Sequence, residues 1–258
     1  MLDKIMVDTH THTVLSGHAW STLRENAAAA AKKGMAGMVL TEHGYALPGA
    51  GPSFLTAAQN MLPPVIEGVR TYYGVESNII NLHGELDVDE KSLLFSEFCI
   101  ASMHDICVRP GTDDENTGAF LGALRQPSID ILGHIDDRRT PNHFEVVIKE
   151  AAHLGKLIEI NNNSLLIRKG SKERVEQIAR LCARHDCRVS VASDAHFDEM
   201  IGSVAPALAL LGTLDFPDEL VVNRSQSAFE AYLAERTARL DPLRNARRSI
   251  RIKRFENK

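Results

Sequence analysis

Cysteine is scarce in this sequence, and long apolar runs are missing from it. Cys99, Cys107, Cys182 and Cys187 form no CxxC pair, so neither a disulfide scaffold nor a zinc site built from thiolates is indicated. No stretch reaches the roughly eighteen apolar residues that a membrane span needs, and the N-terminus lacks the apolar segment of a signal peptide. We therefore expect a soluble protein of the reducing cytoplasm, with no membrane partner.

An excess of positive charge is also absent. The chain carries a formal net charge of -5, which gives no general attraction for a polyanion, so nucleic acid is disfavoured as a partner. The basic run 244–258 could be a nucleic-acid arm, but a short solvated tail is the commoner interpretation of such a run.

Nothing in the composition divides the chain. Hydrophobic residues make up 44% of it and charged residues 24%, as in globular proteins with a sizeable core. No linker rich in Pro, Gly or Ser interrupts it. We therefore expect one domain over residues 1–258, a usual length for barrels of repeated strand and helix units.

Short apolar segments alternate with helical ones along the chain. We predict strands at residues 4–8, 37–40, 71–75, 98–102, 129–133, 157–160 and 188–192. We predict helices at 23–33, 144–154, 172–185 and 228–240, with Ser21 and Ser171 as N-caps of the first and third. Residues 48–64 are expected to form a long active-site loop with a short helix. The alternation indicates an α/β fold, a distorted seven-stranded (β/α)7 barrel of the TIM-like type.

Residues of the metal-binding type follow six of the seven predicted strands. In parallel α/β barrels the loops after the strands meet on one face and carry the reactive groups. In chain order these residues are His10, His12, His18, His43, Glu76, His104, His134, Asp194 and His196. We therefore expect them to meet at one rim of the barrel.

The spacing within this set also indicates metal binding. His10 and His12 are two residues apart, so on an extended strand they point to the same face, and Asp194 and His196 repeat that spacing. Imidazole suits zinc, iron, manganese and nickel, while a carboxylate can bridge two ions. Nine candidate ligands are more than one tetrahedral metal site can use. Three ions that share a bridging Glu76 would use them all, and two ions with some histidines outside the first coordination shell are the alternative.

A single histidine or aspartate of this kind means little. A lone histidine is usually a hydrogen-bonded core or surface residue, and an aspartate after a strand is often a helix cap. His143, His153 and His185 fall on predicted helices and are interpreted as structural or solvent-facing. The nine candidates differ from these because each lies where a metal site in a barrel requires it.

The runs DTHTHTVLSGHAWSTL, TEHG, GVES, SMH, LGH and SDAH, in this order between residues 8 and 196, resemble the PHP superfamily, named for polymerase and histidinol phosphatase. The runs EINNNS and RKGS resemble its branch of small bacterial phosphatases with three zinc ions. The resemblance implies one ion at His10, His12, Glu76 and Asp194, a second at Glu76, His104 and His134, and a third at His18, His43 and His196. Zinc is the expected metal, with manganese or iron as alternatives. One departure is LGHIDDRR, where a proline-containing run after the histidine is expected.

The chemistry expected of such a centre is hydrolysis of a small phosphomonoester. Clustered cations would supply a metal-bridging hydroxide that attacks phosphorus and would stabilise the developing charge. We assign Glu76, Asp194 and His196 as catalytic residues. Arg168 and Lys169 are candidates to hold a phosphate oxygen, with a solvated charged pair as the alternative interpretation.

Two other functions fit the same residues. The first is a phosphodiesterase or exonuclease-like hydrolase, which the acidic charge balance disfavours. The second is a metal-binding regulatory module without catalysis, which the complete ligand set disfavours. Among phosphomonoesters, the sequence leaves a sugar phosphate, histidinol phosphate and a nucleotide equally open.

Overall fold

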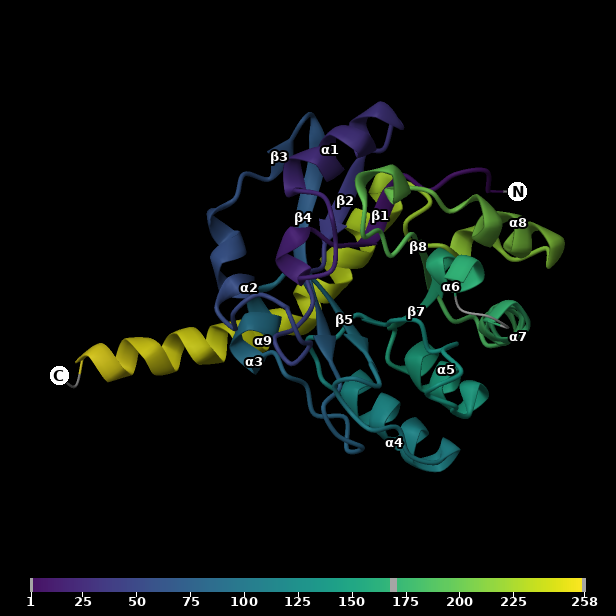
Figure 1. Cartoon of the computed structure of the whole chain (residues 1–258). Helices are drawn as coiled ribbons and strands as arrows, with labels where there is room; N and C mark the ends of the chain where they lie inside the picture. Colours follow the sequence, from purple (N-terminus) through teal and green to yellow (C-terminus); the bar gives the residue numbers. More distant parts are fainter. Residues whose placement is uncertain (1, 168–170, 257–258) are drawn as a thin grey trace.

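The computed structural model describes residues 2–167 and 171–256 and forms a nearly closed barrel of parallel strands (Figure 1). The barrel strands, in spatial order, are β1 (Val7–Thr11), β2 (Gly37–Leu40), β4 (Val69–Asn78), β5 (Phe98–Ser102), β6 (Ile131–Leu132), β7 (Leu157–Asn161) and β8 (Val189–Ala192). A short strand, β3 (Val65–Ile66), pairs antiparallel with β4. An isolated bridge between Thr11 and Ala195 joins the two ends of the sheet. The expected distorted (β/α)7 barrel is confirmed.

Helices surround the barrel (Figure 1). They are α1 (Leu23–Lys32), α2 (Leu55–Ala58), α3 (Glu90–Phe95), α4 (Asp113–Leu124), α5 (Phe144–His153), α6 (Asn162–Ile167), α7 (Ser171–Arg184), α8 (Ala205–Thr213) and α9 (Gln226–Glu256), with 3-10 turns η1 (Val14–Ser16), η2 (Gln59–Met61), η3 (Asp198–Met200) and η4 (Asp218–Leu220). None of these described helices combines the length and the apolar character needed to cross a membrane.

Several boundaries differ from the sequence prediction. The N-cap of α1 is Thr22 rather than Ser21, because Thr22 and Glu25 form a reciprocal capping box. Ser21 instead contacts Asp198 of η3. The first strand begins at Val7, three residues later than expected. The last helix continues through Pro242 to Glu256, although proline usually ends a helix.

The barrel interior is apolar at one end and polar at the other. Near the amino ends of the strands, inward side chains form one buried apolar cluster with Phe229 and Tyr232 of α9, which closes that end. On β7, the apolar Leu157 is followed two residues later by Glu159. On β4, Tyr72 is followed at the inward positions by Gly74 and then Glu76. On β4 and β7 the inward side chains therefore change from apolar to polar toward the carboxyl ends of the strands.

A buried ion network fastens α9 to the closed end. Arg236 of α9 donates from Nε to Asp130 Oδ2 at 2.6 Å and from Nη1 to the carbonyl oxygen of Ser96 at 2.8 Å. Arg239 donates to Asp130 Oδ1 at 2.7 Å. Asp130 also accepts the backbone N–H of Cys99 at 2.8 Å. Charged groups in this network are thus paired and hydrogen-bonded, as buried charges require.

Candidate metal centre

Glu76 lies at the centre of the polar end, fully buried on β4. Its Oε2 lies 3.2 Å from His10 Nε2 and 2.7 Å from His43 Nδ1. Its Oε1 lies 3.0 Å from His134 Nε2 and 3.5 Å from His104 Nε2. One carboxylate therefore contacts imidazoles that come from four different strands or their loops. It has the position of a bridging group.

Asp194 occupies the opposite side of the same site. Its Oδ1 lies 3.5 Å from His10 Nε2 and 3.4 Å from His12 Nε2. His18 and His196 complete this side, with their Nε2 atoms 2.9 Å apart. All nine residues that the sequence singled out are therefore brought to one end of the barrel.

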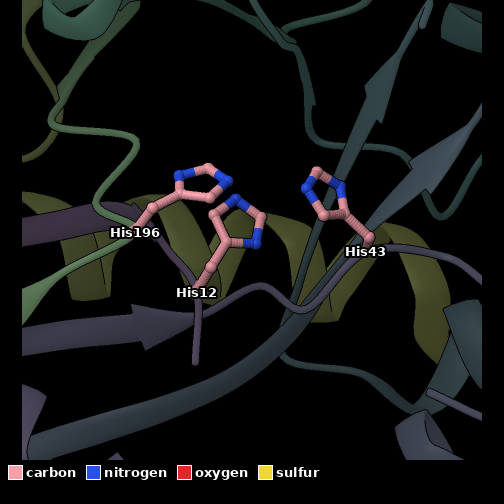
Figure 2. A group of neighbouring side chains, drawn as sticks. All are labelled: His12, His43 and His196. Carbon is pink, nitrogen blue, oxygen red and sulfur yellow. The ribbon is translucent and has the colours of Figure 1, made fainter. Parts of the chain in front are cut away.

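Three overlapping groups within the site have the mutual spacing of metal ligands, with all ligand atoms within 4.8 Å of one another. They are His12, His43 and His196; His10, His12 and Glu76; and His43, Glu76 and His104. Figure 2 shows the first group, in which the ring centroid of His12 lies 4.3 Å from that of His43 and 4.4 Å from that of His196. The assignment of single residues to single ions stays a prediction.

Five polar atoms of this site are buried and, among the described residues, meet no partner in hydrogen-bond geometry, although Glu76 Oε2 lies 2.7 Å from His43 Nδ1 and 3.2 Å from His10 Nε2. They are His10 Nε2, His12 Nε2, His43 Nδ1, His43 Nε2 and Glu76 Oε2. Buried polar groups are nearly always hydrogen-bonded, and leaving one unsatisfied costs about 1–3 kcal/mol. Here the unsatisfied atoms are imidazole nitrogens and a carboxylate oxygen in mutual proximity. This donor set fits a cluster of divalent cations.

Glu159 orients two of these residues, although the sequence prediction did not include it. Its Oε1 lies 2.6 Å from His10 Nδ1, and its Oε2 accepts the backbone N–H of His134 at 2.8 Å. Asn161 donates to the same oxygen at 3.0 Å. A carboxylate on the far nitrogen fixes the tautomer of a ligand histidine and directs Nε2 into the site. The inward position of Glu159 on its strand is the signal that could have revealed it.

Other candidate ligand histidines have similar outward partners. His12 Nδ1 lies 3.1 Å from Ser16 Oγ, which donates to the buried carboxylate of Glu42. His104 Nδ1 donates to Asn78 Oδ1 at 2.7 Å, and Asn78 in turn donates to Asp87 Oδ2 at 2.6 Å. These partners leave Nε2 of each ring directed inward, which is the arrangement typical of metal-binding histidines.

The ionisation of the site favours cations. Burial lowers the pKa of His12 well below its usual value, and the imidazoles of His43 and His196 lower it further. Burial lowers the pKa of His43 to about 4. Burial would raise the pKa of Glu76, but His10 and His43 hold it well below the usual range. The neutral imidazoles of His12 and His43 beside an ionised carboxylate are forms that bind metal ions. Burial would lower the pKa of His10, but the carboxylates of Glu159, Glu76 and Asp194 raise it well above its usual value, so a metal ion at His10 would have to displace a proton.

Local backbone geometry helps to orient the candidate ligand side chains. The pairing of β1 with β2 shifts register between Asp8 and Thr11, and such bulges re-aim side chains near active sites. His134 and Asp194 have positive φ angles of 29° and 54°, a strained conformation that often occurs at functional sites. Gly133 is required before His134, since an added Cβ would come within 2.3 Å of a neighbouring serine oxygen.

A cavity of about 460 Å³ opens over the ligands. Besides ligand residues it is lined by Leu47, Arg139, Asn163, Ile167 and Met200. Arg139 is held at this mouth by Asp137 at 2.6 Å and Asp105 at 2.8 Å. The predicted substrate contacts, Arg168 and Lys169, lie outside the described residues.

Of the three histidines that were interpreted as structural, His153 lies on a helix and the other two lie directly beside helices. His143 precedes α5 and contacts Asp114 at 2.8 Å, and His185 follows α7 and contacts Glu145 at 3.0 Å. His153 is the last residue of α5. None of the three lines the cavity over the ligands.

Comparison with known proteins agrees with this geometry. The PHP domain family model matches residues 8–205. A protein of Clostridium botulinum named a probable phosphatase is 39% identical over 230 residues, which cover 89% of this chain and 95% of the relative. A probable phosphatase of Acetivibrio thermocellus is 39% identical over 237 residues, which cover 92% of this chain and 98% of the relative.

Solved structures share the fold at low sequence identity. The crystal structure of histidinol phosphate phosphatase from Lactococcus lactis, in complex with zinc, L-histidinol and phosphate, matches with a TM-score of 0.60 at 15% identity and covers 84% of this chain and 95% of that chain. A chain of archaeal ribonuclease P with mature tRNA matches with a TM-score of 0.52 at 16% identity, covering 90% and 91%. The family-model match and the close relatives, which extend over most of this sequence, lead to one conclusion: the chain belongs to the PHP domain family.

Proposed function

We propose that this protein is a metal-dependent phosphatase that hydrolyses a small phosphomonoester. Relatives that are 39% identical over nearly their whole length are named probable phosphatases, which supports the enzyme class. The single observation that carries the proposal is the group of buried imidazole and carboxylate atoms without partners around Glu76. Such a donor set suits several divalent cations held close together.

Zinc is the cation that we propose, with two or three ions per chain and with manganese or iron as alternatives. The proposed ligands are His10, His12, His18, His43, Glu76, His104, His134, Asp194 and His196. A structural neighbour solved with zinc supports this choice of metal. Divalent cations bound here would lower the pKa of a bound water toward neutrality and polarise a phosphoryl oxygen.

The chain's own residues supply orientation and charge. Glu76 and Asp194 bring two negative charges among the imidazoles, and Glu159 holds the ring of His10 in place. We assign Glu76, Asp194 and His196 to the reaction itself, since all three line the cavity over the ligands. Arg139 at the same mouth offers guanidinium N–H groups to a phosphoryl oxygen, in addition to Arg168 and Lys169 predicted from the sequence.

Phosphate release tests this function directly. The purified protein is supplied with zinc or manganese and given a panel of phosphomonoesters and, as a diester comparison, bis(4-nitrophenyl) phosphate. We expect inorganic phosphate to be released from at least one monoester and the diester to be a poorer substrate. Preference for the diester would favour the exonuclease-like alternative. Absence of any turnover with every metal tested would contradict a hydrolase.

A further inference from the structure

Four exposed apolar residues lie on segments that follow barrel strands near the candidate metal centre, each on a different segment. They are Trp20, Ile106, Ile167 and Phe197, with exposed fractions of 79%, 64%, 68% and 44%. We call these four residues the apolar collar. Single exposed apolar residues are ordinary, but several that gather around one site usually mark a binding surface.

The backbone places three of these residues close to candidate ligands. The backbone N–H of Trp20 donates to the carbonyl oxygen of His196 at 2.8 Å, so Trp20 lies next to the facing pair of His18 and His196. Phe197 follows His196 in the chain. Ile106 lies in the turn that begins at His104, where the N–H of Cys107 donates to the His104 carbonyl at 2.9 Å.

The cavity over the candidate ligands has an apolar wall that includes one collar residue. Ile167, at the end of α6, belongs to the collar and also lines the cavity, together with Leu47 and Met200. The volume of about 460 Å³ falls within the range of pockets that hold small organic molecules. A phosphate group at the candidate ligands would leave its ester group against this apolar wall, on the side of the barrel where the collar segments lie. An alcohol with only hydroxyl groups would leave that surface exposed to water.

The charge of the protein favours a small organic group over a macromolecule at this surface. A formal net charge of -5 gives no attraction for nucleic acid or for an anionic membrane. Aromatic side chains such as Trp20 and Phe197 bind flat apolar groups by stacking and burial of area.

We propose that the substrate is a phosphomonoester of an alcohol that carries an aromatic or similarly bulky apolar group, and that the apolar collar holds this group. The inference rests on the proposed phosphatase function and narrows its substrate class. It excludes small polyhydroxylated esters, such as sugar phosphates, as preferred substrates.

Two esters of matched chemistry test the proposal by activity. Both 2-phenylethyl phosphate and 2-hydroxyethyl phosphate are primary alkyl monoesters, so they differ chiefly in the apolar group and little in the bond that is cleaved. We expect kcat/KM to be higher for the phenyl compound by roughly tenfold or more. Equal values, or preference for the hydroxyl compound, would overturn the proposal.

Trp20 allows a binding test that does not depend on turnover, because it is the single tryptophan of the chain. The metal-loaded protein is titrated with 2-phenylethylphosphonate and with 2-hydroxyethylphosphonate, whose P–C bonds are not hydrolysed. We expect the tryptophan emission to change and saturate with the phenyl compound at a concentration roughly tenfold lower. No difference between the two overturns the collar. If the two phosphonates saturate at clearly different concentrations but the protein hydrolyses no ester, the collar proposal is supported and the proposed phosphatase function is contradicted.

A pair of substitutions locates the preference. Ile106→Ser removes one collar side chain, whereas Val146→Ser removes an apolar side chain of 49% exposure on α5, away from the cavity. We expect Ile106→Ser to lower the ratio of the two kcat/KM values several-fold and Val146→Ser to leave the ratio as it is. The same small effect in both variants would contradict the proposal.

Discussion

The two ends of the barrel treat buried charge in opposite ways. At the closed end, Asp130 and Arg236 are paired with each other and with backbone groups. At the open end, Glu76 and the imidazoles around it leave several buried polar atoms without a hydrogen-bond partner among the described residues. Both sets are buried, so burial alone does not distinguish them. Their difference is whether the chain itself completes their bonding.

This difference separates a structural polar cluster from a binding one. A complete network contributes to holding α9 under the barrel, and its loss leaves an uncompensated charge. An incomplete network leaves buried polar groups unsatisfied, which is unfavourable, and a bound ligand can satisfy them. The four predictions below test that division from the largest effect to the smallest.

Replacing His10 with Ala should have the largest effect, and it should fall on activity. His10 Nε2 faces both Glu76 and Asp194, so its loss opens the centre of the ligand set. We expect kcat/KM for the best phosphomonoester to fall by more than about a thousandfold and bound metal to decrease. Steady-state kinetics and elemental analysis measure both. Full activity in a folded His10→Ala variant would refute the assignment.

Arg236→Met should have the next largest effect, and it should fall on stability. The substitution leaves Asp130 buried without its main partner, although Arg239 and Tyr232 still contact it. We expect the free energy of unfolding in urea to decrease by about 3–5 kcal/mol, while the molecules that stay folded keep their metal content. A decrease below about 1 kcal/mol would show that the closed end does not depend on this pair.

Glu159→Gln should affect metal affinity moderately. The amide can no longer accept from His10 and His134 as the carboxylate does, so the ring of His10 loses its fixed orientation. We expect metal affinity, measured by competition with a chelator, to fall by about 10–100-fold. Glu145→Gln, on the exposed surface of α5, serves as the matched control and should keep the original affinity. Equal losses in the two variants would contradict a role for Glu159 in orientation.

Arg125→Ala should have the smallest effect of the four. Arg125 Nε lies 2.7 Å from Glu150 Oε1, but its side chain is 61% exposed. Exposed ion pairs contribute about 0.2–1 kcal/mol because water and salt screen them. Urea unfolding should therefore show a change several times smaller than that of Arg236→Met. A change of equal size would mean that burial does not set the strength of these pairs.

The strand order and the barrel class could be predicted from the sequence, since each apolar segment and each following ligand-type residue carries a local signal. The nine candidate ligands meet at one end because parallel strands bring their carboxyl ends together. That they bind metal stays a prediction. The end of β4 was not predicted correctly: the strand continues to Asn78, so Glu76 lies within it rather than after it.

Features that depend on neighbouring strands were missed. Glu159 lies in an apolar strand, and only the position of His10 across the barrel shows what it does. The bulge in β1 arises from its register with β2, which no local pattern reveals. By contrast, α4 was not among the predicted helices, although its capping box of Thr112 and Glu115 is a local signal that can be recognised in the sequence. The predicted end of the last helix at residue 240 was wrong, because α9 continues through Pro242 to Glu256.

Elemental analysis of the purified protein, before and after exhaustive chelation, tests most directly whether the open end is built for cations. We expect more than one equivalent of divalent metal per chain, removed by the chelator together with the phosphatase activity and reduced in the His10→Ala variant. A protein that carries no metal when purified and takes up none from zinc or manganese solutions, yet remains folded, would contradict this expectation.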